Sequence, residues 1–277
     1  MEIQVEVHTT LKGNGFSAIE YHEGKLFAIA DNTEAIIELD KSGNIVEMHG
    51  DASQVEKKIK PDYEAATFIS WKEKLYFMRM ASGSTENRCK LSLIEWKTKE
   101  ESIFSLSNFY AFYQKTANIN LAEINIEALV FQKDSILIFN RSNNQMIQIQ
   151  WEEFFHCLQN KIFEPKIHFQ TLPLGTLNGC YLGVSGACLV GNSIYFTASA
   201  EQTDNWYDDG EIKGSCIGSF SLNHNFQITD LKQVDFKNEM GLIQTKLEGI
   251  TCDDSHFYLI SDNDELGSEF FRIKIDE

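Results

Sequence analysis

The segment Glu127-Ala-Leu-Val-Phe, followed after a polar turn by Ser135-Ile-Leu-Ile-Phe, is one of five copies of a single template. Each copy begins with Ser or Glu, continues with Ala or Gly and then contains mostly apolar residues. A second apolar run follows each copy. The copies begin at Ser17, Glu64, Glu127, Ser185 and Glu248. A strand–turn–strand unit repeated in this way predicts a β-propeller, in which each repeat forms one blade.

The spacing of the copies predicts the number of blades. They recur at intervals of 47, 63, 58 and 63 residues, and a four-stranded blade needs about 40–50 residues. The longer intervals leave room for insertions, and residues 102–123 and 151–159 are expected to contain short helices between strands. Few prolines interrupt the chain and no linker is evident, so residues 1–277 are expected to form a single domain.

The last copy is too close to the end of the chain to build a blade alone. Only 30 residues remain from Glu248 onward. Residues 3–9 alternate apolar and polar side chains, as a half-exposed strand does. We expect them to pair with residues 270–275 and close the ring as the outer strand of the last blade. The fold class is therefore all-β, a five-bladed β-propeller.

Composition excludes some classes of function. The formal net charge of −17 argues against nucleic acid as a partner, because binding to phosphate backbones needs a basic surface. No apolar run approaches the roughly 20 residues of a membrane helix, and no basic, apolar leader begins the chain. A cytoplasmic location is expected. The six cysteines show no Cys-x-x-Cys spacing and are interpreted as free, mostly buried thiols.

The first residues of the five copies are the candidate metal ligands. A propeller brings equivalent positions close to its axis, so Ser17, Glu64, Glu127, Ser185 and Glu248 are expected to meet there. Three carboxylates crowded together repel one another, and a cation relieves that repulsion. Ca²⁺ accepts six to eight oxygen ligands in a loose shell, whereas Mg²⁺ requires a strict octahedron. One axial Ca²⁺ is predicted. The alternative is that these side chains only satisfy backbone groups.

The order Ser, Glu, Glu, Ser, Glu around five blades resembles the calcium-activated nucleotidase (apyrase) family. The closest segment is Phe16-Ser-Ala-Ile-Glu-Tyr-His-Glu-Gly-Lys-Leu-Phe-Ala-Ile-Ala-Asp-Asn-Thr, which looks like the opening strand pair of that family. The chain also looks like bacterial esterase-like and phytase-like propellers, through Ile126-Glu-Ala-Leu-Val-Phe and Leu247-Glu-Gly-Ile-Thr. The resemblance implies a five-bladed propeller with Ca²⁺ on its axis and hydrolase activity.

The predicted substrate site consists of polar residues near the ends of the second strands, together with Lys60 and Lys246, which come just before two of the axial glutamates. These ends lie beside the starts of the first strands, so their side chains should reach the same mouth. An anionic substrate is expected at basic and amide side chains, because such groups clamp phosphates and carboxylates; these are Lys60, Arg79, Asn140, Arg141 and Lys246. The candidate catalytic bases are Asp31, Glu201 and Asp262. The alternative is that these are solvated turn residues paired with neighbouring charges.

Two functions from different classes follow from this site. The first is a Ca²⁺-dependent hydrolase of a phosphate, anhydride or ester, with Arg79 and Arg141 holding the anion. The second is a non-catalytic propeller that binds a small molecule, glycan or protein, since fold alone does not fix function. The aromatic and acidic loop at residues 205–210 is either a wall of the mouth or an ordinary turn.

Overall fold

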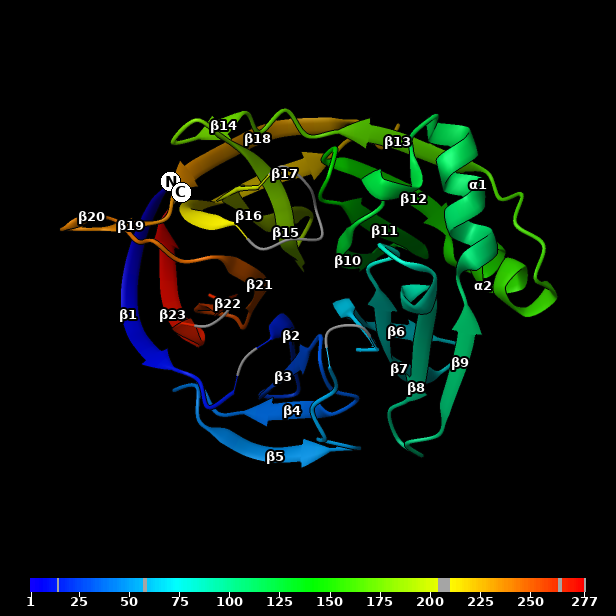
Figure 1. Ribbon diagram of the computed structural model, residues 1–277, viewed down its shortest axis with the longest axis horizontal. Helices are drawn as coiled ribbons and strands as arrows, with labels where there is room; N and C mark the ends of the chain where they lie inside the picture. Colours follow the sequence, from blue (N-terminus) through cyan, green and yellow to red (C-terminus); the bar gives the residue numbers. More distant parts are fainter. Residues whose placement is uncertain (14, 57–58, 204–209, 264–265, 277) are drawn as a thin grey trace.

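The computed structural model describes residues 1–13, 15–56, 59–203, 210–263 and 266–276. It confirms the predicted fold class: the protein is mostly β, with 57% strand and 11% helix, arranged as a five-bladed β-propeller. Figure 1 looks down the ring and shows the blades arranged around a central axis. Most of the aromatic and acidic loop at 205–210 lies outside the described residues. None of the helices described is long and apolar enough to cross a membrane.

Each blade is an antiparallel sheet whose strands follow one another outward from the axis. Blade 1 contains β2 (Phe16–His22), β3 (Lys25–Ala30), β4 (Ile36–Leu39) and β5 (Ile45–His49). Blade 2 contains β6 (Tyr63–Trp71), β7 (Lys74–Ala81), β8 (Lys90–Glu95) and β9 (Glu101–Ser105). Blade 3 contains β10 (Ile126–Gln132), β11 (Ser135–Asn140), β12 (Gln145–Gln150) and β13 (Ile167–Thr171).

The last two blades follow the same plan with additions. Blade 4 contains β15 (Cys180–Val190), β16 (Ser193–Gln202), β17 (Glu211–Leu222) and β18 (Ile228–Asp235), with the short β14 (Thr176–Leu177) paired to β15. Blade 5 contains β21 (Leu247–Cys252), β22 (Phe257–Asp262), β23 (Ser268–Asp276) and β1 (Glu2–Thr10). Between the two blades lies a small hairpin of β19 (Lys237–Asn238) and β20 (Gly241–Leu242). Four of the inner strands begin one residue before a template residue, whereas β15 begins earlier.

The ring closes through the first strand of the chain, as predicted. β1 pairs antiparallel with β23, with Ile3 opposite Ile275 and Thr9 opposite Phe270. The two strands lie side by side in Figure 1, and the marked chain ends meet at the same edge. Every second residue of β1 is exposed, so one face packs on the core and the other faces solvent. The first and last segments of the chain therefore share one blade, with β1 as its outer strand.

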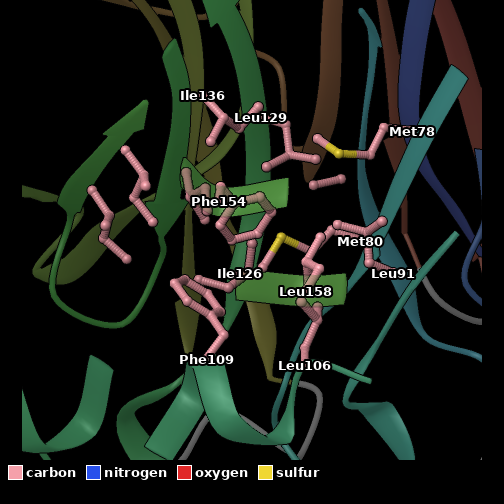
Figure 2. Close-up of a cluster of buried hydrophobic side chains, with 14 of the residues drawn as sticks. Met78, Met80, Leu91, Leu106, Phe109, Ile126, Leu129, Ile136, Phe154 and Leu158 are labelled. Atoms are coloured by element: carbon pink, nitrogen blue, oxygen red, sulfur yellow. The ribbon is translucent and has the colours of Figure 1, made fainter. Parts of the chain in front are cut away.

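The two longest insertions are helical, as expected, and they lie at the periphery beside blades 2 and 3 (Figure 1). They form α1 (Ser107–Ala117) and α2 (Trp151–Asn160), and short 3₁₀ turns cover Glu86–Arg88 and Leu121–Glu123. Phe109 from α1 and Phe154 from α2 pack edge to face, with ring centroids 5.6 Å apart. Figure 2 shows both rings among Met78 and Met80 of blade 2 and Ile126 of blade 3.

Candidate functional site

The five Ser and Glu residues of the template occupy one structural position. In every inner strand the residues on either side of the template residue pair with the second strand, while the template residue is the extra residue of a β-bulge. These bulge residues are Ser17, Glu64, Glu127, Ser185 and Glu248. A bulge re-aims a side chain relative to the regular ladder and is frequent beside functional sites. We call the end of the channel that carries them the axial mouth.

The two bulge serines connect neighbouring blades. The Ser17 hydroxyl donates to the Tyr63 carbonyl oxygen at 2.6 Å, and the Ser185 hydroxyl donates to the Leu247 carbonyl oxygen at 2.5 Å. Each acceptor is the residue immediately before the bulge glutamate of the next blade. The serines therefore fix the backbone that carries Glu64 and Glu248, and their hydroxyl protons are already used. Backbone satisfaction is thus their observed role.

Arg141 joins three carboxylates on one side of the axial mouth. Its Nη2 lies 2.7 Å from Glu201 Oε2, and its Nη1 lies 3.5 Å from Glu248 Oε1 and 3.8 Å from Glu127 Oε1. Lys246 adds a second cation, with Nζ 3.0 Å from Glu248 Oε1 and 3.5 Å from Glu201 Oε2. Two bulge glutamates are therefore partly neutralised by cations of the protein itself.

Gly183 on β15 makes room for the Arg141 side chain. A Cβ added to Gly183 would lie 2.5 Å from Arg141 Cγ, closer than real Cβ contacts occur. The guanidinium reaches Glu201 only because this neighbouring strand has no side chain there. Arg141 is 4% exposed, so it is a built part of the axial mouth and not a solvated turn residue.

A second charge cluster lies around Asp62 on the opposite side of the axial mouth. Lys60 Nζ pairs with Asp31 and lies 2.9 Å from Asp62 Oδ1. The second Asp62 oxygen lies 3.1 Å from Arg88 Nη1 and accepts a hydrogen bond from the Ser82 hydroxyl. Carboxylate oxygens of Asp31, Asp62 and Glu64 lie within 4.8 Å of one another. Among the described residues, Glu64 forms no direct ion pair.

Four carboxyl groups of the axial mouth have raised pKa values, and burial is the largest cause for each of them. Burial raises the pKa of Glu127 to about 8, with a further increase from Glu248 and an opposing decrease from Arg141. Burial, together with Asp62 and Glu127, raises the pKa of Glu64 well above its ordinary value. Burial also raises the pKa values of Glu248 and Asp31. The mouth is therefore short of positive charge.

Two carboxylate oxygens of the axial mouth are buried and have no hydrogen-bond partner within the part of the chain that the structure describes. They are Glu201 Oε1 and Glu248 Oε2. A buried polar atom that forms no hydrogen bond costs about 1–3 kcal/mol. Each of these two carboxylates uses its other oxygen for Arg141 or Lys246. The free oxygens are positions at which a bound cation, a water or a ligand donor would lower the energy of the site.

Arg79 lies apart from these two clusters. Its guanidinium stacks on the Tyr63 ring at 4.4 Å, donates to the Glu34 carbonyl at 2.7 Å and pairs with Glu101 at 2.8 Å. These groups belong to the packing between blades 1 and 2. The reason is register: β7 continues to Ala81, so the residue equivalent to Arg141 is Ser82, whose N–H donates to the Asp62 carbonyl.

Of the other predicted substrate and base residues, Asn140 and Asp262 form hydrogen bonds with backbone groups, and the rest meet at the axial mouth. Asn140 is fully buried and organises the turn after β11, donating to the Glu123 carbonyl and accepting from the Asn125 N–H at 2.7 Å. Asp262 accepts from the Gly15 N–H at 3.1 Å, and its charge acts on Asp31. Asp31, Lys60, Arg141, Glu201 and Lys246 come together at the axial mouth, and Arg79 does not.

Three residues at the site were missed from the sequence. Asp62 and Asn125 each lie two residues before a bulge glutamate, and the Asn125 amide donates to Glu127 Oε1 at 2.7 Å. Because both residues lie at the same distance before a bulge glutamate, a comparison of the repeats could have identified them. Asp62 also has a left-handed backbone with φ of 58°. Arg88 belongs to the 3₁₀ turn Glu86–Arg88, and no repeated pattern marks it.

Below the bulge residues the channel is narrow. The next residue of every inner strand is Ala or Gly, which lets the five strands converge, and the cavity that remains there is only about 10 Å³. That volume holds at most about one water molecule. Any ligand larger than water that binds at the axial mouth must stay at this end of the channel.

Comparisons with known proteins agree on the fold. The chain is similar to glutaminyl cyclase from Myxococcus xanthus, with a TM-score of 0.56, 10% identity, and 99% of this chain and 96% of that chain covered. It is also similar to a putative glycoside hydrolase from Parabacteroides distasonis, with a TM-score of 0.54, 9% identity, and 97% and 88% covered. No curated protein matches the chain. Residues 15–275 match the family of unknown function DUF6929, and this protein belongs to that family.

Proposed function

We propose that the axial mouth binds a divalent cation, with Ca²⁺ favoured, and that the protein hydrolyses a phosphate, anhydride or ester bound beside it. The observation that carries this is the group of Asp31, Asp62 and Glu64, whose oxygens lie within 4.8 Å of one another. Hard oxygen ligands with a loose arrangement suit Ca²⁺ better than Mg²⁺. The five bulge residues as one ligand set remain a prediction, because Glu127 and Glu248 also pair with cations of the protein.

The residues present fit a cation. The unpartnered oxygens of Glu201 and Glu248, and the raised pKa values of Glu64 and Glu127, indicate a site with too little positive charge. Lys60 partly supplies it through Asp31 and Asp62. A bound cation would take over from Lys60, freeing the ammonium group to contact an anionic substrate. When bound, the cation would polarise the reacting oxygen of the substrate.

Two of the carboxyl groups that pair with Arg141 can take complementary acid–base roles. Glu127, with a pKa of about 8, keeps its proton at neutral pH and can donate it to a leaving group. Glu201 has one oxygen held by Arg141 and one without a partner, so it can accept a proton from an attacking water. One carboxyl group that donates a proton and one that accepts a proton are the two roles that acid–base hydrolysis requires.

The decisive experiment measures binding and turnover together. Chelator-treated protein is titrated with Ca²⁺ in a calorimeter and then assayed, with and without Ca²⁺, against nucleoside di- and triphosphates, phosphate monoesters and simple carboxylate esters. Binding only to the folded state should stabilise it by about 2.7 kcal/mol when Ca²⁺ is at a hundredfold excess over Kd. The resemblance of the template to calcium-activated nucleotidases makes nucleotides the first substrates to test.

Three variants separate the parts of this proposal. Glu64→Gln should weaken Ca²⁺ binding at least tenfold, because it removes the one bulge glutamate without a direct ion pair among the described residues. Glu201→Gln should weaken Ca²⁺ binding less than Glu64→Gln does, because Arg141 already holds one of its two oxygens, and it should reduce kcat. Glu95→Gln, in the peripheral pair with Lys74, is the matched control and should change neither. If Ca²⁺ produces no heat and no change in melting temperature, the cation site is wrong.

A non-catalytic binding function is the second candidate. Among the described residues, the ion-pair partners of Arg141 all lie within the axial mouth, and the bulge serines are occupied by hydrogen bonds to the backbone. Such groups can serve to hold the blades together. Ca²⁺ binding without turnover of any phosphate or ester, together with unchanged affinity in Glu201→Gln, would favour this candidate over the hydrolase.

A further inference from the structure

The opposite end of the channel contains two thiols on neighbouring blades. A cavity of about 180 Å³ lies there, lined by residues three and four positions after the bulge residue in all five inner strands. Cys188 on β15 is the third residue after Ser185, and Cys252 on β21 is the fourth residue after Glu248. Both line this cavity, which we call the thiol mouth.

The geometry of the ring places these two side chains against each other. The junction between blades 5 and 1 shows how such positions meet. Tyr21 is the fourth residue after its bulge residue, and Thr251 is the third residue after its own. The N–H of Tyr21 donates to the Thr251 hydroxyl at 3.0 Å. Cys252 and Cys188 stand in the same relation, one blade earlier, and both line the same cavity.

The strands that carry the thiols approach unusually closely. A Cβ on Gly186 would lie 2.9 Å from the Gly249 Cα and 3.0 Å from the Glu248 carbonyl oxygen. Glycine at both positions therefore lets β15 and β21 come together just before the cysteines. Side chains of two cysteines can be bridged only when their Cα atoms lie within about 7 Å, and this close approach favours such a distance.

The two thiols differ in exposure and in ionisation. Cys188 is 6% exposed, whereas Cys252 is partly exposed at the cavity. The neighbouring Cys188 thiol lowers the pKa of Cys252, whereas the neighbouring Cys252 and burial raise the pKa of Cys188. A thiolate, not a thiol, attacks disulfides. Cys252 thus has the properties of an attacking thiol and Cys188 those of a resolving thiol.

We propose that Cys188 and Cys252 form a thiol–disulfide pair that is oxidised by low-molecular-weight disulfides and links blade 4 to blade 5. The Cys252 thiolate attacks the small disulfide, forming a mixed disulfide and releasing one thiolate. Cys188 then loses its proton and attacks the Cys252 sulfur, which forms the protein disulfide and releases the second thiolate. Two protein thiols are oxidised and one small disulfide is reduced to two thiols.

A metal site is a poorer explanation of the same residues. Glu20 also lines the thiol mouth, and burial, with a smaller contribution from Cys252, raises its pKa well above the ordinary value. Among the described residues, the groups close enough to share an ion are Asp31, Asp62 and Glu64, and Glu38, Glu47 and His49. The two thiols and Glu20 do not form such a group. This inference is independent of the proposed function.

The test is a redox titration of the purified protein. Samples are equilibrated with mixtures of reduced and oxidised glutathione, alkylated with N-ethylmaleimide, and weighed intact. The oxidised protein should lose two alkylation sites relative to the reduced one. After trypsin digestion, one linked species should join residues 167–213 to residues 247–272. Because the first peptide also contains Cys180, the experiment uses Cys180→Ser as the starting variant.

Single variants assign the two roles. Cys188→Ser should accumulate a glutathione mixed disulfide on Cys252, because the resolving thiol is missing. Cys252→Ser should leave Cys188 unmodified under the same conditions. Cys216→Ser, which removes a buried thiol of blade 4, should still form the linked species. Retention of both alkylatable thiols at every glutathione ratio, or a stable mixed disulfide on Cys252 with Cys188 present, would overturn the proposal.

Discussion

The Arg141 guanidinium extends from the end of β11 in blade 3 to the Glu248 carboxylate of blade 5, with 3.5 Å between Nη1 and Oε1. It passes over blade 4 at Gly183, where a side chain would collide with it. One residue thus connects three blades around the axial mouth. The mouth is consequently held by charge as well as by the hydrogen bonds of Ser17 and Ser185.

We expect Arg141→Met to destabilise the protein strongly. The change leaves Glu127, Glu201 and Glu248 without their shared cation, and removing one partner of a buried ion pair costs about 3–5 kcal/mol. Urea unfolding measures the loss. Lys25→Ala, which breaks the surface pair with Glu38 at 2.9 Å, is the control and should cost less than about 1 kcal/mol. Equal losses in both variants would contradict a structural role for Arg141.

The repeat explains why so much of the fold could be predicted. The template fixes the inner hairpin of each blade, and the alternation in residues 3–9 indicates closure with β23. The sequence shows one equivalent position in each blade, but it does not show that this position is a β-bulge. The residues concerned are Ser17, Glu64, Glu127, Ser185 and Glu248. Both inserted helices were also expected, although nothing in the pattern says that they pack beside blades 2 and 3.

The charged partners were harder to predict, because they depend on strand length. Arg79 was placed at the mouth by counting from a short second strand, whereas β7 runs on to Ala81 and puts Ser82 there. Arg88 reaches Asp62 from a 3₁₀ turn that belongs to no repeat. Register and irregular turns are set by tertiary packing, and a repeated motif carries little information about them.

The pKa of Glu127 predicts a pH dependence of stability in the absence of added cation. The folded carboxyl keeps its proton up to about pH 8, whereas the ordinary glutamate pKa of 4.5 applies to the unfolded chain. The folded protein therefore binds more protons across this interval, and its free energy of unfolding falls as pH rises from about 4.5 to 8. The slope from one such group is at most about 1.4 kcal/mol per pH unit.

Glu127→Gln should flatten that dependence. The amide cannot ionise, while its oxygen can still accept the hydrogen bond from Asn125. Urea unfolding at several pH values should show a smaller decline than in the unchanged protein, and Glu95→Gln should show the same decline. A decline of equal size in the Glu127→Gln variant would mean that this carboxyl is already ionised at neutral pH.

Gly186→Ala should separate blades 4 and 5 at the axis. The new Cβ would meet the Gly249 Cα at 2.9 Å and the Thr197 hydroxyl at 2.8 Å, and overpacking of this kind costs about 1–3 kcal/mol. Ala65→Gly changes the equivalent position of blade 2 in the opposite direction. It should cost roughly 0.5–1 kcal/mol, through backbone entropy. A stability loss for Gly186→Ala no larger than that of Ala65→Gly would contradict the close approach.

Closure of the ring predicts the effect of removing the first strand. Deleting residues 1–9 takes away most of the ladder that pairs with β23 and leaves that strand as an edge with unpaired backbone groups. Such an edge pairs readily with other chains, so the shortened protein should associate as well as lose stability. Light scattering and urea unfolding measure the two effects.

Gln4→Lys, on the exposed face of β1, keeps the ladder and should remain as stable and as dispersed as the unchanged protein. A shortened protein that stays monomeric with an unchanged urea midpoint would show that β1 is dispensable for closing the ring.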